Sequence, residues 1–322
     1  MDESQKSPDA EATPAPFQIS PQEPPTPSRS VPPVGVRLLL YLGCSAFTIW
    51  FTLWFGTSLF PEPVRGPAVL WQEMYAEAAL AFGVLMPAIL MARIEGKPVD
   101  DYGLPRREAF GKWFCLGSAS GLASITALML LLRGAHAFYF GRIVLHGPRA
   151  LRFALFWAVF FMVVALFEEF LLRGYTLHTL AQQFGFWPAA VLLSLIFGAI
   201  HMRNPGETWI GLLGVVAIGL FLCLTLYRTG NLWFAVGFHA FWDWGQTYLY
   251  SVPDSGTFEP GHLMQPSFQG PAWLTGGSAG PEASLLCFAV IAGVSGIFAR
   301  RYRRIRYCIV SEAKETPHPS QA

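Results

Sequence analysis

Apolar runs separated by short polar segments follow one another along the chain. The first run, from Leu38 to Phe60, carries no charge and is long enough at 1.5 Å per residue to cross about 30 Å of hydrocarbon. A succession of such runs predicts membrane-spanning helices. We therefore expect an all-α fold, a polytopic membrane helix bundle of about eight transmembrane helices. The expected spans lie near residues 36–60, 68–92, 114–132, 153–180, 187–202, 208–227, 231–250 and 283–299.

The composition favours a membrane protein over a soluble one. Hydrophobic residues make up 53% of the chain and charged residues 13%, whereas soluble domains carry about 25% charged residues. The mean hydropathy is +0.40. A net charge of +1 provides no basic field for nucleic acid, so nucleic acid is excluded as a partner and the lipid bilayer is the expected surrounding.

The two ends of the chain differ from its middle. Residues 1–34 are rich in Pro, Ser, Gln and Glu, a composition that cannot bury a core, so we expect a disordered Pro-rich tail there. We assign residues 35–305 to one membrane domain and residues 306–322 to a C-terminal tail. Placing both termini in the cytoplasm puts most of the 22 Lys and Arg residues on the cytoplasmic side, as the positive-inside rule requires.

Glu168, Glu169 and Arg173 lie in the fourth apolar run, where ionisable groups are costly and therefore indicate a functional site. Glu169 and Arg173 are four residues apart, so we expect a structural ion pair on one helix face. Glu168 lies about 100° around the helix and lacks that partner. An unpaired carboxylate in apolar surroundings can serve as a general base, the role we assign to Glu168. The alternative is that both glutamates mark the water-facing end of a span.

A histidine ends the fifth run. If the chain turns at Gly185, the two antiparallel helices place His201 at the same depth as Glu168, with Phe197 one turn away as a wall of the site. The structural alternative for His201 is a helix-end position next to the polar segment 204–206.

A second histidine lies in the seventh run. His239 and Asp243 are four residues apart and project on one helix face, so Asp243 can orient His239 or a water molecule. The alternative is a pore-lining pair or an interhelical hydrogen bond. Each motif is weak alone, and their coincidence in neighbouring spans is what predicts a catalytic centre inside the membrane.

With these residues the chain resembles the CPBP family of intramembrane proteases, which includes the CAAX prenyl endopeptidases and bacterial Abi relatives. The family pattern is E-E-x-x-x-R, then F-x-x-x-H, then H-x-x-x-N/D, and the resemblance covers about residues 150–250. The motifs read here Glu168-Glu169-x-x-x-Arg173, Phe197-x-x-x-His201 and His239-x-x-x-Asp243.

The resemblance implies a glutamate-dependent endopeptidase of the bacterial cytoplasmic membrane that hydrolyses a peptide bond of a membrane-associated or lipidated protein. Glu168 would activate water, with His201, His239 and Asp243 assisting. Whether Glu169 shares the proton chemistry stays open, because adjacent acids can titrate as a unit.

Metal dependence is a separate question for this family. Its members have been described as metalloproteases and, now more usually, as metal-independent enzymes. We expect no cofactor. If a divalent metal such as Zn²⁺ is used, His201, His239 and Asp243 are its expected ligands.

Two other functions fit the same intramembrane residues. A proton- or ion-coupled transporter could use the glutamate, histidines and aspartate as a relay, although no inverted repeat is evident in the sequence. A non-catalytic membrane scaffold of the same fold could retain the motifs without turnover.

Overall fold

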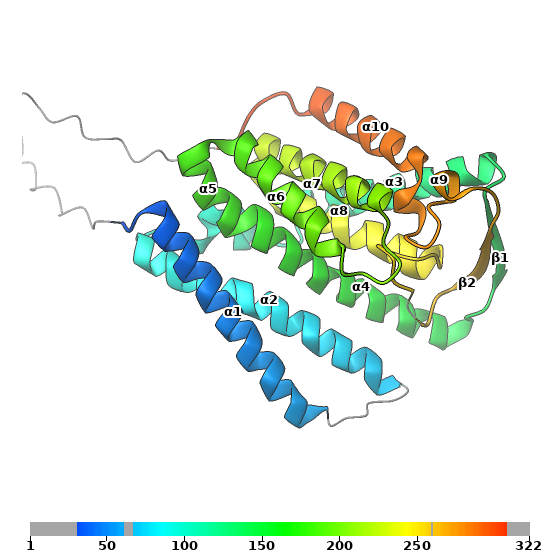
Figure 1. Ribbon diagram of the computed structural model, residues 1–322, viewed down its shortest axis with the longest axis horizontal. Helices are drawn as coiled ribbons and strands as arrows, with labels where there is room; N and C mark the ends of the chain where they lie inside the picture. Colours follow the sequence, from blue (N-terminus) through cyan, green and yellow to red (C-terminus); the bar gives the residue numbers. More distant parts are fainter. Residues whose placement is uncertain (1–30, 61–66, 259, 308–322) are drawn as a thin grey trace, which may run out of the picture. The chain divides into compact units, whose positions relative to one another are not determined.

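The computed structural model of the protein describes residues 31–60, 67–258 and 260–307. It confirms the all-α membrane helix bundle, since every predicted span corresponds to a helix or to consecutive helical segments (Figure 1). The predicted tails, 1–34 and 306–322, lie almost entirely outside the described residues. The α-helices are α1 (Val34–Leu59), α2 (Pro67–Glu95), α3 (Lys112–Gly134), α4 (Gly147–Glu169), α5 (Leu177–Phe184), α6 (Phe186–His201), α7 (Trp209–Thr229), α8 (Trp233–Trp244), α9 (Ala272–Thr275) and α10 (Leu285–Arg301).

Short elements connect or extend these helices. Two π-helical segments, η3 (Phe170–Thr176) and η4 (Gly245–Leu249), continue α4 and α8. Three 3₁₀ turns are η1 (Val99–Tyr102), η2 (Arg106–Glu108) and η5 (Pro281–Ala283). Two strands, β1 (Phe138–Ile143) and β2 (Met264–Phe268), pair antiparallel.

Five stretches among the described residues are long and apolar enough to cross a bilayer: α1, the Val69–Glu95 part of α2, α3, the stretch Gly147–Phe184 and α7. The other three predicted spans correspond to shorter helices, because α6 has 16 residues, α8 has 12 and α10 has 17. Helix α8 is buried along most of its length by other helices, so it does not need to match the bilayer thickness. The chain is a multi-pass membrane protein.

Helix α1 shows the lipid-facing character of the bundle. Only 11% of its most apolar window is buried inside the protein, and Leu39, Phe47 and Trp50 are among its exposed side chains. Exposure of so many large apolar side chains to water is unfavourable, whereas their contact with the hydrocarbon of a bilayer is favourable. Helix α1 contacts chiefly α2, and the two form a helical hairpin (Figure 1).

Glycines bring α3 and α8 into close contact. Gly117 and Gly121 are one turn apart on α3, and a Cβ at either would overlap the carbonyl oxygen of Phe234 or Phe238 on α8. Small residues at such positions let membrane helices approach closely enough for backbone packing. Because α8 carries His239 and Asp243, this contact fixes the position of one wall of the candidate site.

Gly121→Leu is therefore expected to lower the free energy of unfolding by about 3 kcal/mol, because the larger side chain forces α3 away from α8. Thermal unfolding of the purified protein in detergent measures the loss. Gly293→Leu on α10 is the matched control, since a Cβ at Gly293 meets no atom within 4 Å. Equal stability of the two variants would show that this close packing is not needed.

Turn residues determine where the candidate-site helices begin and end. Gly185, with φ 82°, separates α5 from α6, which confirms the predicted turn at this position. Gly230, with φ 66°, ends α7 in the left-handed conformation that glycine adopts without strain. The side chain of Asn231 then accepts a hydrogen bond from the backbone N–H of Trp233 at 2.9 Å, where α8 begins.

The pairing of β1 with β2 was not predicted from the sequence. Phe138 pairs with Phe268 and Ile143 with Met264, with an irregularity in the register between Tyr139 and Arg142. Residues 251–282 lie between the last two predicted spans, 231–250 and 283–299, and were expected to be a loop. The strand pair anchors this long connection to the segment between α3 and α4.

Candidate active site

The first motif lies where an α-helix changes into a π-helix. Helix α4 ends at Glu169, and Arg173 lies in η3, whose Gly174 has the non-helical angles φ −82° and ψ −113°. Arg173 Nη1 donates to Glu169 Oε1 at 3.0 Å, and neither side chain is exposed to solvent. The structure thus contains the ion pair that the spacing predicts. Single π-helical turns occur frequently at functional sites.

Glu169 also contacts the third motif, which the spacing alone did not indicate. Its Oε1 atom, already bonded to Arg173, lies 2.9 Å from Nδ1 of His239. The pair Glu169–Arg173 therefore extends from α4 and η3 to α8. One consequence is that Glu169, rather than Asp243 alone, determines how the His239 ring is oriented.

The other ring nitrogen of His239 faces two more carboxylates. Nε2 is 3.2 Å from Oδ2 of Asp243 and 3.6 Å from Oε2 of Glu168. Glu168 is thus near an imidazole rather than without any partner, while Arg173 is bonded to the neighbouring glutamate. His239 connects all three acidic side chains of the predicted set.

The Arg173 guanidinium is enclosed by the protein. Its Cζ lies 4.4 Å from the centre of the Phe197 ring, a cation–π contact. A Cβ on Gly219 of α7 would lie 2.7 Å from Arg173 Nη2 and 3.2 Å from Oγ of Ser194, so a side chain there would displace the guanidinium. The absence of a side chain at Gly219 makes room for the guanidinium.

His201 is the last residue of α6, as its helix-end interpretation requires, and it also reaches the site. Its Nδ1 donates to the carbonyl oxygen of Phe197 at 2.8 Å, and the two rings meet edge to face with centroids 4.7 Å apart. This bond leaves Nε2 as the ring nitrogen available to a ligand. Phe197 thus contacts both His201 and Arg173, and it is a wall of the site as predicted.

One cavity of about 360 Å³ brings the second and third motifs together with Glu168. Glu168, His201, His239 and Asp243 all line it. Glu169 and Arg173 do not line it. A cavity of this size, lined by apolar side chains and by several ionisable groups, can hold water and part of a peptide.

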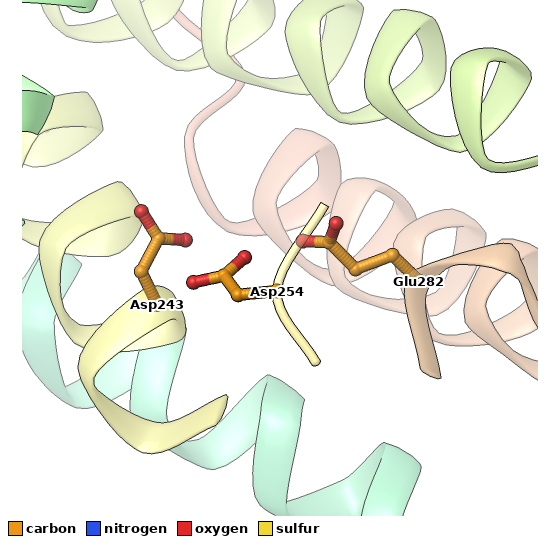
Figure 2. Close-up of side chains that lie close together, drawn as sticks. All are labelled: Asp243, Asp254 and Glu282. Atoms are coloured by element: carbon orange, nitrogen blue, oxygen red, sulfur yellow. The ribbon is translucent and has the colours of Figure 1, made fainter. Parts of the chain in front are cut away.

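Sequence reasoning missed four acidic residues of this cavity, of which Glu73 and Glu77 lie on α2 and the other two lie outside the long helices. Asp254 follows η4, and Glu282 lies in η5 just before α10, within the connection that had been given no functional role. Figure 2 shows their carboxylates directed toward one another and toward Asp243. Their acidity in a connection without Lys or Arg was the only available signal, because no motif spacing relates them to the helices.

Hydrogen bonds from the protein hold both of these carboxylates. Glu282 accepts from Nε1 of Trp242 at 2.9 Å and from Oγ of Ser255 at 2.8 Å. Asp254 accepts from Oγ1 of Thr247 at 3.0 Å. These donors offset part of the cost of burying the acids.

Asp243, Asp254 and Glu282 also form the group of potential metal ligands found among the described residues, with ligand atoms within 4.8 Å of one another. The set expected from the sequence, His201, His239 and Asp243, does not form such a group there. Three carboxylates suit a hard cation such as Mg²⁺ or Ca²⁺, whereas zinc sites usually contain histidine or cysteine. The hydrogen bonds already made to Asp254 and Glu282 account for the cluster without an ion.

Burial and mutual repulsion change the protonation of Asp254 and Glu282. Burial first, and then the charge of Asp243, raise the pKa of Glu282 to about 7. Burial, followed by the charges of Asp243 and Glu282, raises the pKa of Asp254 well above its ordinary value. Both acids therefore keep a proton at a pH where an exposed carboxyl group is ionised.

The raised pKa of Glu282 makes stability depend on pH. Its contribution is fully present below the unfolded pKa of 4.5 and is lost as the pH rises through about 7. Over this window the parent is expected to lose on the order of 1–3 kcal/mol of unfolding free energy. Glutamine does not titrate, so the unfolding free energy of Glu282→Gln is expected to fall less steeply with pH. Denaturation in detergent between pH 4.5 and 8 measures the slope. Asp101→Asn, at an exposed position, is the control, and an unchanged slope in Glu282→Gln would contradict the assignment.

Comparison with protein families supports the resemblance seen in the motifs. Residues 150–245 match the model of a family described as type II CAAX prenyl endopeptidase Rce1-like. The match confirms the resemblance to the CPBP and CAAX proteases, and it includes all three motifs. Comparison with curated proteins and with solved structures gave no match.

Proposed function

We propose that this chain, whose residues 150–245 match the Rce1-like family of CAAX-type proteases, is an intramembrane endopeptidase in which Glu168 activates the attacking water. The observation that carries the proposal is the shared cavity. Glu168, His201, His239 and Asp243 come from three separate helices and line a single space inside the bundle. A general base, two imidazoles and room for water are the components that peptide hydrolysis needs.

Glu168 is suited to the role of base. Its side chain is 21% exposed, so water can reach it, whereas the Glu169 side chain is fully buried and bonded to Arg173. Glu168 takes a proton as the water oxygen attacks the peptide carbonyl carbon, and it returns that proton to the leaving amine when the C–N bond breaks. Glu168 is thus returned to its ionised form, and no further acid is required.

His201 stabilises the charge that develops on the carbonyl oxygen, and His239 with Asp243 helps to hold the attacking water. His201 can donate from Nε2 when both of its ring nitrogens carry protons, because Nδ1 is already bonded to Phe197. His239 is held from the other side by Glu169, and Asp243 lies against its Nε2. In this mechanism Glu169 and Arg173 are positioning residues, and the protein supplies pre-oriented donors rather than a covalent nucleophile.

The proposed substrate is a membrane-associated or lipidated protein. The bundle exposes apolar side chains to the bilayer, so a peptide anchored in the same membrane meets the protein at high effective concentration. The proposed location is the bacterial cytoplasmic membrane, with both termini in the cytoplasm and residues 35–305 as one domain. The exposed arginines 300, 301, 303 and 304 at the end of α10 fit the positive-inside rule in this orientation.

A reconstitution experiment tests the proposal. The full chain is placed in liposomes with a library of lipidated and hydrophobic-tail peptides, and products are identified by mass spectrometry. We expect cleavage by the parent and its loss in His201→Ala. A pH-sensitive dye inside the same liposomes reports proton flux, and flux without cleavage would support a transporter. Neither signal would support a scaffold, and retention of cleavage with a chelator would set zinc aside.

A further inference from the structure

Carboxylates are the most numerous ionisable groups in the lining of the catalytic cavity. Two imidazoles are present, and within the described part of the chain no Lys or Arg lines the cavity. The balance of charge in this space is therefore acidic, unlike that of the whole protein, which is +1. The six acidic residues that line it are Glu73, Glu77, Glu168, Asp243, Asp254 and Glu282.

The acids come from separate elements and converge on one space. Glu73 and Glu77 lie one turn apart on α2, opposite Glu168 of α4. Asp243, Asp254 and Glu282 form the second group, with their carboxylates directed toward one another (Figure 2). Asp243 connects this group to the proposed reaction centre, because its Oδ2 lies 3.2 Å from His239 Nε2.

We infer that this cavity selects a substrate that places a Lys or Arg side chain in it, beside the scissile bond. The inference rests on the proposed protease function and adds the substrate class. Several acids gathered in a space of low dielectric repel one another, and a cationic side chain relieves that repulsion while a neutral one does not. An ammonium group has three donors, and a guanidinium has five, so each can bond more than one of the converging oxygens.

The same lining disfavours negative substrate groups. A free C-terminal carboxylate or an acidic side chain beside the scissile bond would meet the acidic side chains of the cavity and no Lys or Arg from the described lining. Like charges at close range are a strong element of selection against a wrong substrate. The preferred peptide therefore has its basic residue inside the chain, with the terminus outside the cavity.

Asp254 and Glu282 lie outside the three sequence motifs, and hydrogen bonds fix the positions of their carboxylates. Asp254 and Glu282 are held by Thr247, Trp242 and Ser255, so their carboxylates are oriented before a ligand arrives.

The test uses the full chain in liposomes and a set of membrane-anchored peptides that differ at one position. Each residue flanking the cleaved bond is Lys, Arg, Gln or Glu in turn, and kcat/KM is measured for each peptide. At one of these positions, we expect kcat/KM for the Lys or Arg peptide to exceed that for the Gln peptide by about 10- to 100-fold, the range for a charge-assisted hydrogen bond. We expect kcat/KM for the Glu peptide to be lower than that for the Gln peptide. Glu282→Gln and Asp254→Asn are expected to bring the Lys-to-Gln ratio toward one, whereas Asp101→Asn keeps it.

Each outcome of this test has a distinct meaning. Cleavage by the parent with equal kcat/KM for Lys and Gln at every position overturns charge selection and leaves the protease function standing. A preference that persists in both folded variants, Glu282→Gln and Asp254→Asn, overturns the role of these two acids. Absence of cleavage of every peptide by the parent overturns the protease function, and the inference with it.

Discussion

Glu168→Gln is expected to lower kcat for peptide cleavage by about 10²- to 10⁴-fold, the usual contribution of a general base. The amide has nearly the shape of the carboxylate but cannot take a proton from water. The cavity and the arrangement around His239 should persist, because Glu168 lies 3.6 Å from Nε2 and the shorter contacts to this ring come from Glu169 and Asp243. Single-turnover kinetics with a reconstituted protein and one anchored peptide measure the effect.

The accompanying measurements separate chemistry from binding in this variant. KM should change little, because the substitution removes an interaction that matters in the transition state. Asp101→Asn, an exposed position far from the motifs in sequence, serves as the control for handling and reconstitution. A kcat in Glu168→Gln within a few-fold of the parent would require a different base, and Glu169 would be the next residue to test.

Arg173→Ala is expected to destabilise the protein by about 3–5 kcal/mol, the cost of removing one partner of a buried ion pair. The Glu169 carboxylate would remain fully buried, with its Oε1 atom 2.9 Å from Nδ1 of His239. The cation–π contact with Phe197 would be lost as well. Thermal and denaturant unfolding in detergent measure the change.

Arg107→Ala is the matched control for Arg173→Ala, since Arg107 is exposed in η2. It is expected to unfold within about 0.5 kcal/mol of the parent. A well-folded Arg173→Ala protein with full stability and no activity would show that the guanidinium acts in the chemistry. In that case the positioning role assigned to the pair Glu169–Arg173 is wrong.

Hydropathy was sufficient to predict the helices of this protein. Long apolar runs can satisfy their backbone hydrogen bonds in a bilayer only as helices, so the positions of these helices follow directly from the sequence. The turn at Gly185 was also predictable, because a glycine between two apolar runs accommodates the positive φ that ends a helix. The pair Glu169–Arg173 followed from the four-residue spacing alone.

Tertiary contacts could not be predicted in the same way. The bond between Glu169 and His239 joins residues 70 positions apart, and helix periodicity does not determine which faces of two helices meet. Asp254 and Glu282 reach the cavity only because a long connection folds back and is anchored by β1 and β2. The strands are short, and their alternation is too brief to be distinguished from a loop. The π-helical form of η3 likewise has no clear sequence signal.

We propose that one carboxylate in an intramembrane cavity, Glu168, activates water for peptide hydrolysis. The most direct measurement compares the parent and Glu168→Gln in the same liposomes, at equal folded amounts, with one anchored peptide in H₂¹⁸O. The parent is expected to form two fragments, one of which carries ¹⁸O in its new carboxyl group, whereas Glu168→Gln is expected to form almost no product. Equal product from both proteins, or proton flux in the parent without any product, would contradict it.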